Sequence, residues 1–178
     1  MEKVLLAIGG VKPSQKVFEY AMRLCQRLKA ELRVLQVVRS GQWGQRLKKV
    51  QRSGQRAKRL LEESMVAATF AEAGEHETAK DIMAQARKNK DIMAQARKNM
   101  DRLMPESQRA GIAYHLTMTS ESPSKEIINY VNEHRGVVLT IYDAGLGETP
   151  GSDVSAEDTE VAKEIVQHLS TPVVLRQR

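Results

Sequence analysis

The sequence predicts an α/β fold in which five parallel strands form one doubly wound sheet with helices on both faces. Short apolar runs alternate along the chain with longer segments whose apolar residues recur every three or four positions. Several of these runs are apolar at every position, which is expected of strands covered on both faces. The first 38 residues already contain a strand, a helix and a second strand, the unit from which parallel sheets are built.

The first strand is predicted at residues 4–8, where the apolar run VLLAI ends at the glycine pair 9–10. A helix follows, because Pro13 and Ser14 are favoured in a first turn. The second strand is predicted at residues 32–38 (LRVLQVV). The helix has one apolar face, formed by Val17, Phe18, Ala21, Leu24, Cys25 and Leu28.

Residues 40–59 differ in character, because they contain seven lysines and arginines and no acidic residue. We interpret this stretch as a solvated basic connector that leads into a helix at about residues 55–73. Binding to nucleic acid or to an anionic lipid surface is the sharper alternative, and the net charge of +6 is compatible with it. Only Trp43 interrupts the basic run with an aromatic ring, and no nucleic-acid-binding motif is present, so nucleic-acid binding is not expected.

Residues 80–89 and 90–99 are the same ten-residue sequence, KDIMAQARKN. A recent tandem duplication and an engineered insertion both explain this identity. The composition favours an extended helix over about residues 78–104. Ten helical residues advance the chain by about 15 Å and turn it by about 80° beyond whole turns, so the two copies cannot pack on one sheet in the same way. The helix therefore extends beyond the sheet, one copy bulges out, or the segment reaches a partner chain.

The second half of the chain continues the alternation, with Pro105 and Gly111 separating it from the repeat. The predicted elements are a strand at 113–118, a helix that starts at Ser122 and Pro123, a strand at 137–141, a polar glycine-rich loop at 143–153, a helix at 155–169 capped by Ser155 and Asp158, and a strand at 173–175. In folds of this kind, ligands bind at the carboxyl ends of the strands. Here that edge carries Gly9, Gly10, Val38 and residues 142–145.

Several classes of function are disfavoured by composition. The single cysteine, Cys25, excludes an intrachain disulfide and suits a reducing compartment. No signal peptide or membrane-spanning apolar run is recognisable, so we expect a cytoplasmic location. The four histidines are scattered and share no metal-ligand spacing, and no G-x-S-x-G motif or catalytic triad is present. We therefore expect no metal site and no enzymatic activity, and a buried, unreactive Cys25.

Five segments of the chain resemble the universal stress protein family. They are VLLAI-GG-x-x-P-S, AYHLTM, SPSKEIINYV, VVLTIYDAG and EVAKEIVQHLSTPVVLR, in the family's order along the chain. The resemblance omits residues 40–99. It implies an adenine nucleotide alpha hydrolase-like fold of one domain over residues 1–178, with 80–99 as a duplicated helical insertion. It also implies a homodimer joined through the final strand. An apolar edge strand left bare invites such pairing, and its residues here are Val173, Val174 and Leu175.

The resemblance also implies where a nucleotide is expected to bind. ATP-binding members carry an aspartate after the first strand and a loop G-x2-G-x9-G-[S/T] after the fourth. In this chain Gly9 replaces the aspartate, Tyr142 replaces the first glycine of the loop, and only Gly145 matches. The pair that begins the next helix aligns with Thr159–Glu160 or, by strict spacing, with Ser155–Ala156. Glu160 and the acidic residues around it disfavour phosphate. If ATP binding is retained, the expected binding residues are Gly9, Gly10, Val38, Gly145, Gly147, Gly151 and Ser152.

Three hypotheses follow. The first is a non-enzymatic, dimeric binding or regulatory module of the universal stress protein type, with weak or no nucleotide affinity and a protein partner that the sequence does not identify. The second is an ATP-binding stress protein that uses a divergent loop at residues 145–152. The third is a natural or engineered helix-duplication variant, in which the repeat switches the register of the helix between two pairings.

Overall fold

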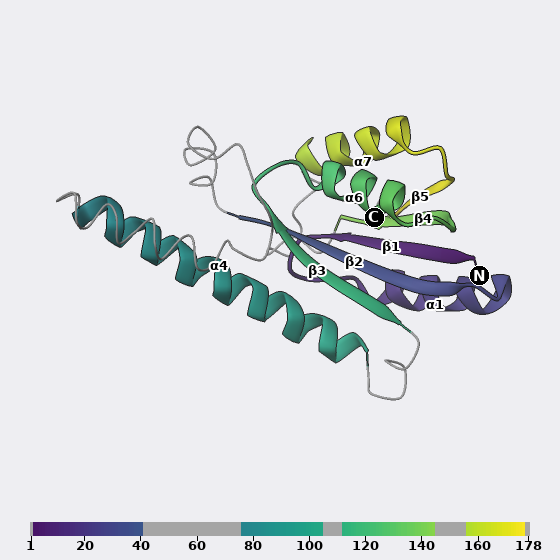
Figure 1. Ribbon diagram of the computed structural model, residues 1–178. Coiled ribbons are helices and arrows are strands. Elements are labelled where there is room, and N and C mark those ends of the chain that lie inside the picture. The colour runs from purple at the N-terminus through teal and green to yellow at the C-terminus, as the bar shows by residue number, and fades with distance from the viewer. Residues whose placement is uncertain (1, 41–75, 105–111, 145–155, 177–178) are drawn as a thin grey trace.

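The computed structural model describes residues 2–40, 76–104, 112–144 and 156–176, and every structural statement below concerns these residues. They form a five-stranded parallel sheet with the strand order β3-β2-β1-β4-β5 (Figure 1). The predicted fold class is therefore confirmed. The elements are β1 (Lys3–Gly9), α1 (Gln15–Leu28), β2 (Glu31–Arg39), α4 (His76–Leu103), β3 (Ala113–Thr119), α6 (Pro123–Glu133), β4 (Val137–Asp143), α7 (Ala156–His168) and β5 (Val173–Arg176).

Helices cover both faces of the sheet, as expected of a doubly wound fold. Helices α1 and α4 lie on one face, and α6 and α7 lie on the other (Figure 1). Strand β1 is central, and its residues 4–8 are at most 1% exposed. Because side chains alternate along a strand, Leu6 of β1 packs toward α1, and Leu5 and Ala7 pack toward α6 and α7. This two-sided burial is why the run VLLAI contains no polar residue.

Strand β4 runs two residues further than the sequence predicted. Tyr142 and Asp143 pair with Ala7 and Ile8 of β1, and Asp143 also pairs with Arg176 of β5. Asp143 therefore ends a strand, and its assignment to the following loop was wrong. An aspartate is tolerated at this position because the backbone N–H of Ser14 donates a hydrogen bond to its carboxylate over 2.8 Å. The remainder of the predicted loop lies outside the described residues.

The predicted extended helix is confirmed as α4, a single helix of 28 residues and thus about 42 Å long. Its C-terminal part lies beside β3 and β2, and its N-terminal part extends past the end of the sheet (Figure 1). Met100 and Met104 belong to the core between α4, α1 and the sheet. The predicted helix at 55–73 and nearly all of the connector at 40–59 lie outside the described residues.

Two local predictions concern helix ends. Ser122 is the N-cap residue of α6, as predicted, but its side chain makes no capping hydrogen bond. The predicted cap of α7 by Ser155 and Asp158 lies outside the described side chains. None of the helices in the described ranges is long and apolar enough to cross a membrane.

Candidate functional site

The candidate site is the edge of the sheet where β1 and β4 end. Strand β1 ends at Gly9, and Gly10 then turns the chain with φ of 99°, a conformation that favours glycine. The N–H of Gly10 donates a hydrogen bond to the Val37 carbonyl over 2.9 Å. The turn is therefore anchored to β2 by its backbone, and the path of the chain past the edge is fixed.

The space beside Gly9 is filled by Tyr142. A Cβ added to Gly9 would lie 2.9 Å from Tyr142 Oη, closer than a real Cβ contact allows. The tyrosine is only 3% exposed and belongs to the core beneath α6 and α7, so its ring has little room to move away. Gly9 and Tyr142 thus form a complementary pair, in which the absence of a side chain on one accommodates the large side chain of the other.

Asp143, the next residue of β4, projects to the opposite face of the sheet. Its carboxylate accepts the hydrogen bond from the backbone N–H of Ser14, the N-cap residue of α1, and the residue is 5% exposed. A helix N-terminus attracts anions because its N–H groups are unpaired and its dipole is positive there. At α1 this position is occupied by a carboxylate of the chain itself.

A buried polar network holds the turn after β1 against β2, β3 and α4. The side chain of Gln36 is fully buried, and its Nε2 donates to the Gly10 carbonyl at 2.8 Å and the Val11 carbonyl at 3.2 Å. The hydroxyl of Tyr114 donates to Gln36 Oε1 over 2.7 Å. Asn99 Nδ2 of α4 donates to the same Val11 carbonyl over 3.1 Å. The second copy of the repeat is therefore bonded to the edge of the candidate site.

Tyr114, the tyrosine of this network, has a raised pKa. Burial raises the pKa of Tyr114 to about 12, and Asp101 adds to the increase while Arg97 opposes it. Sequence reasoning missed the network. The available signal was Gln36 itself, because one amide inside the otherwise apolar end of β2 must find buried hydrogen-bond partners.

A second polar cluster joins α6 to α7. The Ser124 hydroxyl donates to the Glu164 carboxylate, and the Ser122 hydroxyl lies 3.2 Å from the same oxygen. The hydrogen bond from Ser124 lowers the pKa of Glu164, with further lowering from Ser122, His168 and Lys125. Here too a carboxylate of the chain lies at a helix N-terminus, that of α6.

The relationship to known proteins follows from the whole chain. A model of the universal stress protein family matches residues 1–175. The chain belongs to the universal stress protein family. No curated protein matches it. Among solved structures, UspA from Lactobacillus plantarum is 17% identical, with a TM-score of 0.53 over 99% of this chain and 97% of that one.

Two further solved members of the family are more distant. A universal stress protein from Burkholderia pseudomallei is 15% identical, with a TM-score of 0.48 over 99% of this chain and 96% of that one. The protein from Archaeoglobus fulgidus in complex with dAMP is 13% identical, with a TM-score of 0.44 over 99% and 100% of the two chains. The similarity to UspA supports the fold of this family member.

The structure brings together only some of the residues predicted to bind nucleotide in this universal stress protein. Gly9 and Gly10 lie at the candidate site, whereas Val38 is 2% exposed within β2 and pairs with Met118. The other predicted residues, Gly145, Gly147, Gly151 and Ser152, lie outside the described residues.

The family's Gly-[S/T] pair, which begins the last helix, has two possible counterparts in this chain. Helix α7 starts at Ala156, so Thr159–Glu160 lies one turn inside the helix. Ser155–Ala156, given by strict spacing, coincides with the helix start. Glu160 is exposed on α7.

The residues predicted to form the dimer edge lie in β5. This strand is at one end of the sheet, and within the described ranges it pairs only with β4. Val173, Val174 and Leu175 are all partly exposed. The position is suitable for pairing with a second strand, and pairing itself stays a prediction.

The side chains of the cysteine and of three histidines belong to the described part of the chain and lie at separate places in the fold. Cys25 is buried, and burial raises the pKa of its thiol, which disfavours the reactive thiolate. The rings of Tyr130 and His134 stack with their centroids 3.9 Å apart, and the ring centroids of His115 and Tyr130 are 6.1 Å apart. No group of three or more histidine, cysteine or acidic side chains suited to a metal ion occurs in the described ranges.

Proposed function

We propose that this chain is a non-enzymatic binding module of the universal stress protein family that acts through protein contacts and has weak or no affinity for nucleotide. The observation that carries the proposal is the end of β4. Tyr142 fills the space beside Gly9, and Asp143 occupies the N-terminus of α1. A nucleotide requires open space for its base and sugar and unpaired N–H donors for its phosphates. Here Tyr142 occupies space beside Gly9 that a base or sugar would need, and Asp143 occupies an N–H donor of α1 that a phosphate would need.

Electrostatics supports the same proposal. Asp143 ends β4 beside the turn at Gly10, and Glu160 lies one turn into α7. Bringing a triphosphate to this edge places like charges close together in a partly buried setting, where their repulsion is weakly screened. The proposed lack of enzymatic activity is supported separately by Cys25, because this thiol is buried and its raised pKa disfavours the nucleophilic thiolate.

We further propose that the module is a homodimer joined through β5. The support is the location of β5 at the end of the sheet and the partial exposure of Val173, Val174 and Leu175. An exposed apolar edge strand is a template for pairing. Sedimentation velocity at micromolar concentration is expected to show a dimer that Val174→Lys converts to a monomer. A wild-type monomer under these conditions contradicts the dimer but leaves the nucleotide proposal standing.

Isothermal titration calorimetry with ATP and Mg²⁺ tests the nucleotide proposal. The wild-type chain is expected to give a flat trace. A heat of binding that disappears in the Gly145→Glu variant would overturn the proposal in favour of the alternative, an ATP-binding protein that uses residues 145–152. Glutamate at this position is chosen because its charge opposes phosphate wherever the loop lies.

A double-mutant cycle tests the geometry independently of any ligand. Gly9→Ala is expected to destabilise the wild-type chain by about 1–3 kcal/mol, the usual cost of overpacking. In a Tyr142→Ala background, the same substitution is expected to cost much less, because the atom that it would meet is gone. Equal costs in the two backgrounds would show that Tyr142 does not fill the space beside Gly9.

A further inference from the structure

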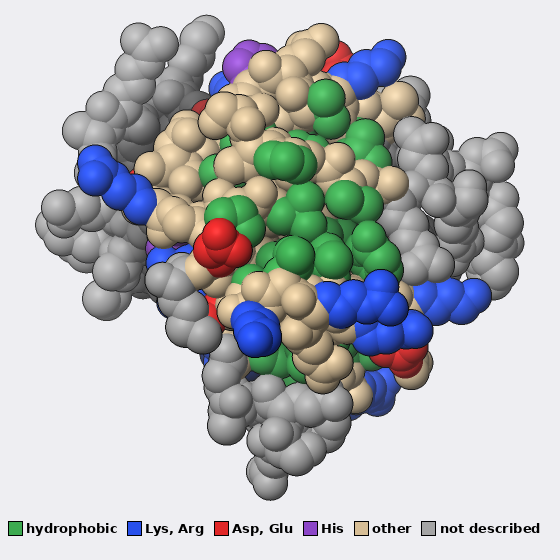
Figure 2. All heavy atoms as spheres, turned by 90° about the vertical axis from the view of Figure 1, so that its right-hand side faces the viewer, with side chains coloured by type: hydrophobic (Ala, Val, Ile, Leu, Met, Phe, Trp, Pro, Cys, Tyr) green, Lys and Arg blue, Asp and Glu red, His purple; other side chains and the backbone are tan. Residues whose placement is uncertain are grey.

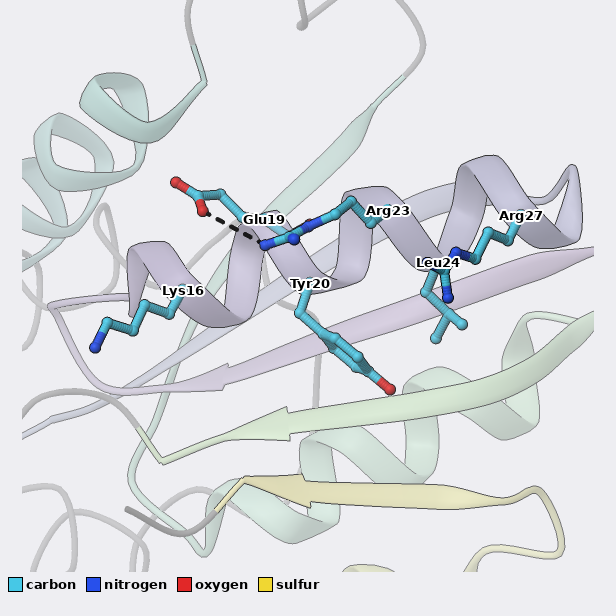
Figure 3. Close-up of a pocket in the computed structure, with 6 residues that line it drawn as sticks. All are labelled: Lys16, Glu19, Tyr20, Arg23, Leu24 and Arg27. Atoms are coloured by element: carbon cyan, nitrogen blue, oxygen red, sulfur yellow. Dashed lines mark hydrogen bonds and ion pairs between the residues drawn. The ribbon is translucent and has the colours of Figure 1, made fainter.

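The outer face of α1 carries a groove whose lining residues belong neither to the proposed nucleotide site nor to the proposed dimer edge. The groove has a volume of about 360 Å³ and is lined by Lys16, Glu19, Tyr20, Arg23, Leu24 and Arg27. Figure 3 shows Tyr20 and Leu24 pointing from α1 toward the side where β4 runs, whereas Lys16 points away from them. The groove therefore has an apolar floor and a charged rim, and we call it the α1 groove.

The apolar floor continues onto the sheet. Leu139 of β4 and Val174 of β5 are partly buried and pack against the same core cluster as Leu24. Viewed from this side, no described helix lies in front of β4 or β5 (Figure 3). Figure 2 shows hydrophobic side chains gathered in one patch, with lysine and arginine side chains along its lower border. Contiguous exposed apolar surface on a folded domain usually marks a site of interaction.

The charges of the rim indicate the sign of the partner. Lys16, Arg23 and Arg27 contribute three positive charges, and Glu19 contributes the one negative charge. Among the described residues, Glu19 is ion-paired with Arg23 over 3.8 Å, and both side chains are at least half exposed. A second copy that packed symmetrically through the same groove would bring the same excess of positive charge to it. An acidic surface complements it, and such complementarity accelerates association and sets specificity.

The shape of the groove indicates a helix. Its lining residues span positions 16–27 of one helix at intervals of three and four, so they form the ridges between which a second helix packs. Twelve residues correspond to about 18 Å, or roughly three turns. An amphipathic helix of this length presents apolar anchors at i, i+3 or i+4, and i+7 to such a surface.

We propose that the α1 groove binds an acidic amphipathic helix of a partner protein. Its apolar residues contact Tyr20, Leu24 and the face of β4 that carries Leu139, and its carboxylates face Lys16, Arg23 and Arg27. Lysine and arginine cover apolar surface with their stems while their charged ends stay in water, so these residues contribute to both parts of the contact. The site lies on the face of the sheet that α1 covers, whereas Tyr142 belongs to the core under α6 and α7, so the proposal does not depend on whether nucleotide binds.

A designed peptide tests the proposal. The probe is a fluorescein-labelled 18-residue helix with leucine at i, i+3, i+4 and i+7 on one face and glutamate on the other. Fluorescence anisotropy against the full chain is expected to show saturable binding. Tyr20→Ser is expected to weaken binding about tenfold, as for loss of an aromatic anchor. Arg27→Glu is expected to weaken it several-fold, with a smaller effect at high salt.

The control variant changes an exposed apolar residue in another part of the chain. Val166 on α7 is 49% exposed and Tyr20 is 42% exposed, and α7 lies on the opposite face of the sheet, so Val166→Ser is expected to leave binding unchanged. Because both positions are at the surface, the variants are expected to fold, which circular dichroism verifies.

Four results would overturn the proposal. The first is no saturable binding of the glutamate peptide. The second is equal binding of a peptide with the same composition and a scrambled pattern. The third is tighter binding of a DNA duplex through Arg27. The fourth is self-association of the wild-type chain that Tyr20→Ser abolishes, because a second copy would then occupy the groove.

Discussion

The two copies of KDIMAQARKN have the same sequence and lie in the same helix, yet they have different surroundings. In the second copy, Ala96 is fully buried, whereas its counterpart Ala86 is partly exposed. Asn99 reaches the Val11 carbonyl, while the Asn89 side chain accepts a bond from Gln85 within the helix and has no other hydrogen-bond partner among the described residues. The local sequence therefore specifies the helix, and the position along the helix specifies what each side chain contacts.

Each copy has a buried residue of its own, Ile82 in the first and Ala96 in the second, and the residue that follows each copy distinguishes them further. Met100 follows the second copy and is fully buried in the core, whereas Lys90 follows the first copy and is exposed. A slip of α4 by ten residues would place Lys90 where Met100 now lies. Burying an unpaired lysine costs several kcal/mol, so this difference holds the register and argues against a register switch.

The largest expected effect is that of Met100→Lys, which gives both copies the same following residue. The substitution buries a charge and removes a core side chain, so we expect a loss of about 3–5 kcal/mol in the free energy of unfolding, or loss of folding at 37 °C. Urea denaturation followed by circular dichroism measures it.

The matched control for this substitution is the exposed Lys90→Met, for which we expect a change within about 0.5 kcal/mol. If the two variants lose similar stability, Met100 is not what holds α4 in register.

Prediction from the sequence succeeded where the residues of one segment decide its structure. The strand 4–8 was predicted because it is apolar at every position, and the extended helix because its composition favours a helix throughout. The end of β4 was misassigned because Asp143 reads as a loop residue until its partner, the N–H of Ser14, is known. That partner is 129 residues away in the chain, and no local pattern signals it.

The sequence pointed to the carboxyl ends of the strands as the candidate site, but not to the contacts that the side chains make there. The departures at Gly9 and Tyr142 were each visible in the sequence, and their complementarity was not, because it depends on the distance between two strands. The same holds for Gln36, whose partners come from two parts of the chain far from it and from each other, the turn at Gly10 and Val11 and the hydroxyl of Tyr114. The α1 groove was also missed, since Tyr20 lies beside the predicted apolar face of its helix rather than on it.

The buried alanine offers a direct comparison of packing in the two copies. Ala96→Leu inserts three carbon atoms where the side chain is fully buried, and we expect a loss of about 1–3 kcal/mol from overpacking. Ala86→Leu adds the same atoms at a partly exposed position and is expected to cost far less.

Thermal unfolding of the two leucine variants provides the measurement. Both substitutions have nearly the same effect on helix propensity, so the difference reports packing alone. Similar melting temperatures for the two would show that both copies have equivalent surroundings.

Tyr114→Phe tests the polar network that anchors the second copy. It leaves Gln36 Oε1 without the hydroxyl that donates to it, and we expect a loss of about 1–2 kcal/mol in the free energy of unfolding at neutral pH.

The pH dependence of this stability has a definite sign. Because the pKa of Tyr114 is raised from 10.0 to about 12, the folded chain holds this proton more tightly than the unfolded chain does. The stability that the protonated Tyr114 contributes to the folded state is complete below pH 10 and is lost as the pH rises toward 12.

Unfolding measured from pH 8 to 11.5 checks this sign. The wild-type chain is expected to lose stability above about pH 10 more steeply than the phenylalanine variant. Parallel curves would show that Tyr114 titrates normally and that the network does not exclude water.

The smallest expected effect gives the cleanest comparison, because Asn99→Ala and Asn89→Ala change the same residue in the same local sequence. Each substitution removes one hydrogen bond within the helix, from Gln95 over 3.0 Å or from Gln85 over 2.9 Å. Each also gains the same helix propensity. These terms cancel between the two variants, and what remains is the bond from Asn99 to the Val11 carbonyl. In the Asn99→Ala variant the Val11 carbonyl still accepts a hydrogen bond from Gln36, so this carbonyl is not left unsatisfied. We therefore expect Asn99→Ala to be less stable than Asn89→Ala by about 0.5–1 kcal/mol. Urea midpoints resolve a difference of this size. Equal midpoints would mean that Asn99 does not tie α4 to the turn after β1, and the docking of the second copy would then depend on Met100 and Met104 alone.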